Sequence, residues 1–111
     1  MTNTQILKLT NSLIKAKEYA ERQSGVEDEG TCNFDHPQIL FDANTCDAVG
    51  IHRAFEAANI ECYIQRSGKF IVAEVLGCMH GQANKRTTMA EAFRDSLKND
   101  GYEAYVYYQI D

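Results

Sequence analysis

The alternation of two hydrophobic periods along the chain constrains its fold more than any other feature. Apolar residues recur every three or four positions, the period of an amphipathic helix, in residues 6–20, 48–58 and 89–97. Alternating or continuous short apolar runs, which are typical of strands, occupy residues 31–41, 60–66, 69–76 and 102–110. The sequence therefore predicts an α+β protein: a ferredoxin-like β-α-β-β-α-β sheet with an additional N-terminal helix.

The predicted helix and sheet divide the chain into three parts. Residues 1–24 form an N-terminal amphipathic helix, in which Thr2 and Gln5 fit a capping box that satisfies backbone amides at the helix start. Residues 25–30 carry three consecutive acids between glycines, the composition of a solvated linker. Residues 31–111 form the ferredoxin-like domain, and we expect a single folded unit overall.

Polar residues and glycines near the two later helices indicate where each begins and ends. Asp42 or Asn44 can cap the second helix, and Asn59 can end it. Thr88 begins a second capping-box pattern, which predicts that the third helix covers about residues 89–99.

Residues 70–76 are apolar on both faces of the predicted strand. A two-layer α+β domain normally leaves one sheet face in water, so a second covering element is expected. The N-terminal helix is the simplest candidate, and a homodimer formed through the open sheet face is the alternative.

Composition limits the classes of function. The 111 residues suffice for one domain, and sixteen acids against eleven bases give a net charge of −5, so no direct binding to nucleic acid or an anionic membrane is expected. No apolar run approaches the roughly 18 to 20 residues that span a bilayer, and the N-terminus lacks the pattern of a signal peptide. A cytoplasmic location is expected.

The cysteines and histidines do not form a recognisable metal or catalytic motif. The pairs Cys32 with His36 and Cys78 with His80 could each share a strand face, but neither has the usual spacing of a zinc site. A carboxylate such as Glu74 lacks a partner at a spacing typical of acid–base catalysis. We therefore expect no metal, no cofactor and no enzymatic activity.

Three polar segments are expected to meet at one edge of the sheet. A strand order of 4-1-3-2 places residues 30–33, 80–88 and 107–111 together, and the helix start at residues 84–88 offers amides and basic side chains to an anion. The candidate residues for binding a ligand or partner are Asn33, Asp35, Gln82, Asn84, Lys85, Arg86, Thr87, Tyr107 and Gln109. Several tyrosines in the last strand could also form an interface patch.

Three blocks of the sequence, GTCNFD at residues 30–35, GQANKRT at 81–87 and GYEAYVYYQ at 101–109, carry a resemblance. They resemble blocks of small uncharacterised proteins of bacterial phages and mobile elements. By analogy, the resemblance implies an accessory factor that binds and inhibits a host protein such as a defence nuclease, in the manner of an anti-CRISPR protein. Two alternatives remain: a protein that binds a small phosphate- or nucleotide-like ligand at residues 84–88, and a small enzyme that uses the same edge.

Overall fold

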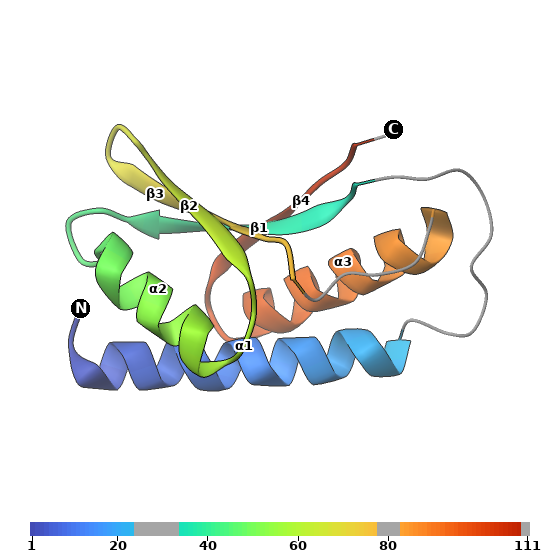
Figure 1. Ribbon diagram of the computed structural model, residues 1–111, viewed down its shortest axis with the longest axis horizontal. Helices are drawn as coiled ribbons and strands as arrows, with labels where there is room; N and C mark the ends of the chain where they lie inside the picture. The colour runs from blue at the N-terminus through green and yellow to red at the C-terminus, as the bar shows by residue number, and fades with distance from the viewer. Residues whose placement is uncertain (24–33, 78–82, 110–111) are drawn as a thin grey trace.

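The computed structural model describes residues 1–23, 34–77 and 83–109, and its helices and strands lie in three layers (Figure 1). The elements, in chain order, are α1 (Asn3–Gln23), β1 (His36–Asp42), α2 (Ala48–Ala57), β2 (Cys62–Ser67), β3 (Phe70–Val75), α3 (Ala83–Asn99) and β4 (Glu103–Tyr107). The predicted α+β class is confirmed. None of the described helices is long and apolar enough to span a membrane.

The four strands form one antiparallel sheet in the order β2-β3-β1-β4, so β1 is central. Pro37 lies in this central strand although proline has no N–H to donate to a neighbour. The register explains why it is tolerated: Pro37 pairs with Val106 of β4, whereas pairing with β3 begins only at Gln38. Pro37 is therefore paired with a neighbouring strand on one side only.

The helices α2 and α3 cover one face of the sheet, and the main core lies between these two layers (Figure 1). Ile39 of β1 and Ala73 of β3 point into this core and are fully buried. Phe55 of α2 and Phe93 of α3 are its largest fully buried side chains. Burial of each such side chain contributes about 1.5 to 3 kcal/mol of transfer free energy.

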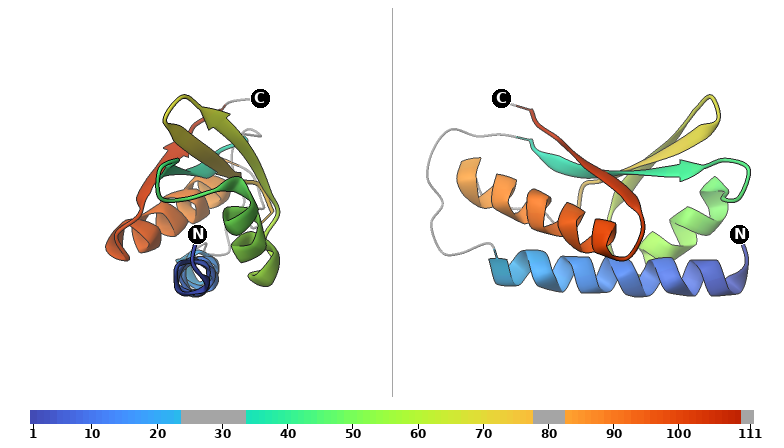
Figure 2. Two further views of the ribbon diagram at one scale, coloured as in Figure 1. Left: turned by 90° about the vertical axis from the view of Figure 1, so that its left-hand side faces the viewer. Right: turned by 180° about the vertical axis from the view of Figure 1, so that it is seen from behind.

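The N-terminal helix forms the third layer. It packs against α2 and α3 on their side away from the sheet, as both views in Figure 2 show. Leu9 and Leu13 of its apolar stripe are fully buried there, and Ile6 is half-buried. The expectation that this helix covers the second sheet face is therefore wrong. The outer surfaces of α2 and α3 also need cover, and the apolar stripe of α1 supplies it.

Local hydrogen bonds test the predicted helix caps. The capping box of α1 is confirmed, with the Thr2 amide donating to Gln5 Oε1 at 2.7 Å and the Gln5 amide donating to Thr2 Oγ1 at 3.1 Å. The predicted caps of α2 are wrong: Asp47 accepts from the Gly50 amide at 2.6 Å. Asn59 follows α2 in the left-handed conformation, with φ of 57°, which agrees with its predicted place at the helix end.

The third helix is longer than predicted. It begins at Ala83, so Thr88 lies inside α3 and does not cap it. Lys85, Arg86 and Thr87, which were expected at the helix start, occupy its first turns. The capping-box pattern was misleading because the first turns of α3 are held by tertiary hydrogen bonds to another segment, which local sequence does not show.

Candidate functional site

The buried carboxylate of Asp35 connects three segments of the chain: the start of β1, the first turns of α3 and the residues that follow β4. Asp35 is 4% exposed. Its Oδ2 accepts from the Thr87 hydroxyl at 2.6 Å, and its Oδ1 accepts from the Gln109 amide at 2.7 Å. Its backbone oxygen accepts from Nε of Arg86 at 2.8 Å. Residues from all three resembling blocks thus meet at a single point, which we call the Asp35 junction (Asp35, Arg86, Thr87 and Gln109).

The bonds of the Asp35 junction show what these groups do in the folded chain. The Thr87 hydroxyl and the Arg86 Nε both donate to Asp35, and these bonds tie α3 to β1. The Gln109 amide ties the segment after β4 to the same residue. A buried carboxylate needs such donors because removing it from water without them costs several kcal/mol. The first role of the junction is therefore to close this edge of the sheet.

The remaining predicted site residues are placed differently. Lys85 is half-buried in the first turn of α3. Tyr107 is exposed at the end of β4, next to His36, with ring centroids 5.3 Å apart. Asn84 lies in α3. Asn33 and Gln82, and the predicted linker at residues 25–30, lie outside the described residues.

A second polar group lies on the sheet face that α2 and α3 do not cover. Gln38 Nε2 donates to Oε1 of Glu74 at 3.0 Å, and Nε2 of His36 lies 3.3 Å from the same oxygen. The other ring nitrogen of His36, Nδ1, is 2.8 Å from the backbone oxygen of Phe34. A backbone oxygen only accepts, so Nδ1 carries a hydrogen. The contact with an ionised Glu74 is then a hydrogen bond only when His36 is protonated.

Glu74 was considered a candidate for acid–base chemistry, but its partners could not be identified from the sequence. His36 and Gln38 are two residues apart on β1, so alternation alone places them on one face. Their meeting with Glu74 depends on the β1–β3 register, in which Gln38 is opposite Glu74. The signal was thus present as a few polar residues on largely apolar strands, but the register that brings His36 and Gln38 to Glu74 is tertiary.

Aromatic and acidic side chains surround this group. Alternation and register place the following residues on the uncovered face, which we call the open face: His36, Gln38, Leu40, Asp42, Tyr63, Gln65, Ser67, Phe70, Val72, Glu74, Glu103, Tyr105 and Tyr107. Phe70 and the three tyrosines are exposed. Within these described strands the open face has three carboxylates and neither lysine nor arginine. Its field is therefore negative.

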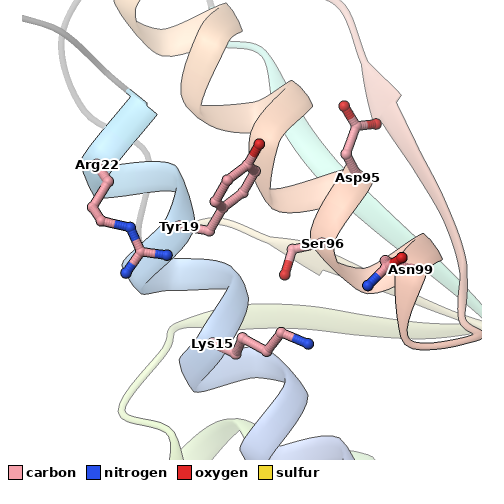
Figure 3. A pocket seen from close by; sticks show the side chains of 6 residues that line it. All are labelled: Lys15, Tyr19, Arg22, Asp95, Ser96 and Asn99. Atoms are coloured by element: carbon pink, nitrogen blue, oxygen red, sulfur yellow. The ribbon is translucent and has the colours of Figure 1, made fainter.

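A pocket of about 270 Å³ lies elsewhere, between α1 and α3 (Figure 3). Lys15 and Tyr19 extend from α1 toward α3, where Ser96 and Asn99 complete the lining. Nζ of Lys15 is bound to Oδ1 of Asp100 at 2.8 Å. This pocket contains none of the predicted site residues. Its two cations already have partners, since Lys15 bonds to Asp100 and the Arg22 guanidinium lies 5.9 Å from the centroid of the Tyr19 ring, so we assign the pocket no ligand.

Comparison of the chain with protein-family models, with curated proteins and with solved structures finds no match. Any function must therefore be argued from the chemistry of the open face and of the Asp35 junction.

Proposed function

We propose that this is a non-enzymatic binding protein whose open face contacts a basic surface of another protein. The observation that carries the proposal is the composition of that face: exposed tyrosines beside three carboxylates, with no lysine or arginine among the strand residues that form the open face. Tyrosine is enriched at protein interfaces because it offers a large apolar area with a polar tip. Negative potential would steer a basic partner and select against acidic ones.

We further propose that the protein is an accessory factor of a phage or mobile element that acts in the cytoplasm by inhibiting a host protein such as a defence nuclease. The resemblance of the three sequence blocks supports this context. Nucleases bind phosphate backbones through basic channels, and an acidic, tyrosine-rich sheet face is complementary to such a channel. The proposal predicts competition with nucleic acid for the host protein.

We also propose that the strands and the helices α2 and α3 form a ferredoxin-like domain. The sheet order, taken from the β4 edge, runs β4-β1-β3-β2, and every neighbouring pair is antiparallel. The helices α2 and α3 connect β1 to β2 and β3 to β4 on one side of the sheet. Both observations support a ferredoxin-like domain, whose free sheet face is the natural docking surface once the helices occupy the other.

Native mass spectrometry of the protein purified from its own host tests the proposal. The wild type is expected to retain a partner protein at low salt and to lose it as ionic strength rises to about 0.5 M, because exposed charges are screened. Tyr105→Arg places on the open face a positive charge, the same sign as that of the basic partner. This repulsion should abolish retention. Asn11→Arg adds the same charge to the exposed surface of α1 and should leave retention unchanged.

Three results would contradict the proposal. They are a partner that Tyr105→Arg retains as well as the wild type, an interaction indifferent to salt, and conversion of a co-purified small molecule into product. The last would favour the enzymatic alternative. A retained phosphate-like anion whose binding needs Arg86 would instead favour the small-ligand alternative.

A further inference from the structure

We infer that the open face recognises an arginine side chain of its partner, and that Glu74 is the residue that binds the guanidinium group. This inference rests on the proposed function and specifies the chemistry of the partner. It depends on the two oxygens of Glu74, on the aromatic residues that flank it and on the charge of the whole face.

The two carboxylate oxygens of Glu74 are used unequally. Both of its described polar contacts, from Gln38 and His36, go to Oε1. Among the described residues Oε2 accepts no hydrogen bond, and the Glu74 side chain is 23% exposed. Glu74 is therefore held through Oε1 by the hydrogen bond from Gln38, with His36 packed against the same oxygen, and keeps the other oxygen for an incoming donor. This preorganisation lowers the entropy cost of binding.

The neighbours of Glu74 favour guanidinium over ammonium. Tyr63 on β2 pairs directly with Glu74, and Tyr105 on β4 pairs with Gln38, so all four residues lie in one row across the sheet. Both tyrosines are 54% exposed. Adjacent strands are about 4.8 Å apart, which places the Tyr63 ring within reach of a group bound at Oε2. A planar guanidinium can bond the carboxylate and stack on an aromatic ring at once, whereas an ammonium is a compact, strongly hydrated charge.

The charge of the open face argues against two other occupants. A second copy of the chain would bring Asp42, Glu74 and Glu103 against their own counterparts with no lysine or arginine from either described face. A single-stranded nucleic acid could stack its bases on the tyrosines, but its phosphates would face the same carboxylates. An arginine-bearing protein segment satisfies both the aromatic rings and the negative charge.

Titration of the purified full-length protein with synthetic peptides tests the inference. The probes are a short peptide of alternating arginine and threonine and the same peptide with lysine for arginine, each followed by amide chemical shifts in about 50 mM salt. The arginine peptide should shift amides of β2 and β3, which carry Tyr63 and Glu74, and bind more tightly than the lysine peptide. Glu74→Gln should weaken its binding by about tenfold or more, since charge-assisted hydrogen bonds are lost.

Matched variants separate recognition from folding. Tyr63→Ala removes an exposed ring and should weaken the arginine peptide more than the lysine peptide. Glu18→Gln and Tyr19→Ala make the same chemical changes on α1 and should leave binding unchanged. The amide spectrum of each unbound variant shows whether the chain is folded. If Glu74→Gln unfolds the protein, the decisive measurements are the binding of both peptides to Tyr63→Ala and to the wild type.

Several outcomes would overturn the inference. Equal affinity for the lysine peptide would show that charge alone is recognised, which leaves the proposed function intact. Binding of a single-stranded oligonucleotide in preference to both peptides, or a concentration-dependent dimer that Tyr105→Arg dissociates, would assign the face to another occupant. Absence of peptide binding, with a host partner still lost in Tyr105→Arg, would contradict arginine recognition but not the proposed function.

Discussion

The Thr87 hydroxyl on α3 lies 2.6 Å from Oδ2 of Asp35, which precedes β1 by one residue. The two residues are separated by 52 positions in the chain, and their hydrogen bond closes the edge of the sheet at which the amide of Gln109 also arrives. The single buried carboxylate of Asp35 therefore connects three segments: the start of α3, the start of β1 and the residues that follow β4.

Removal of this carboxylate should destabilise the protein. In Asp35→Ala the Thr87 hydroxyl and the Gln109 amide lose their acceptor, and a hydrogen bond to a charged group contributes about 1.5 to 3 kcal/mol. Thr87→Val removes one donor but keeps the side-chain shape and should cost less than Asp35→Ala. Urea unfolding followed by circular dichroism measures both free energies. If Asp35→Ala unfolds at the wild-type midpoint, the junction does not contribute to stability.

Gly77 should not tolerate a side chain. A Cβ atom at this position would lie 2.6 Å from the backbone nitrogen of Glu61, and backbone cannot move aside as a flexible side chain can. Gly77→Ala is expected to cost about 1 to 3 kcal/mol of unfolding free energy. Gly50→Ala is the comparison. Its Cβ would meet the Met1 side chain, which can move, and alanine forms helix better than glycine, so the loss of unfolding free energy should be smaller than in Gly77→Ala. Thermal unfolding of the two variants decides the order.

The contact of α1 with the end of α3 should make stability depend on pH below neutrality. Hydrogen bonds from Lys15 and Ser12 lower the pKa of Asp100 from its ordinary value. A lowered pKa stabilises the folded state above the unfolded-state pKa, near 4, and this stabilisation is lost as the pH falls through the folded-state pKa. Lys15→Gln should cost about 0.5 to 1 kcal/mol at pH 7 and progressively less below about pH 4.

Lys17→Gln removes the same charge from α1 without a described ion pair and serves as the control. Urea denaturation across pH 2 to 7, expressed relative to that control, isolates the Lys15 contribution. A difference between the two variants that stays constant over the whole range would contradict the linkage to Asp100.

Cys62 should react slowly with alkylating agents. Burial raises the pKa of its thiol, and the negative charges of Glu56 and Glu61 raise the pKa further. The thiolate is the reactive form, so the alkylation rate of Cys62 in the folded protein should rise only at a higher pH than in the urea-unfolded chain. Peptide-resolved mass spectrometry after timed exposure to iodoacetamide measures this rate. Glu61→Gln should move the profile toward lower pH, whereas Glu18→Gln should not; identical folded and unfolded profiles would refute the prediction.

Local patterns were enough to predict much of the fold. The apolar stripe of α1 and the reciprocal bonds of Thr2 and Gln5 follow from spacings of three and four residues, which bring side chains together within one helix. Alternation in the last strand likewise places Ala104 and Tyr105 on opposite faces, and in the fold Ala104 is buried while Tyr105 is exposed. These features involve neighbours in sequence, so few competing arrangements exist.

The sequence by itself determined the kinds of elements, their order and the polar segments that meet at Asp35. Only the tertiary structure decided three other features: where α3 starts, which layer α1 occupies, and the contact between the His36 and Glu74 side chains. Each of these depends on a choice among distant partners that satisfy the local pattern equally well: an amphipathic stripe can cover a sheet or a helix pair. The choice is made by the total burial and hydrogen bonding of the whole chain, which no local window of sequence contains.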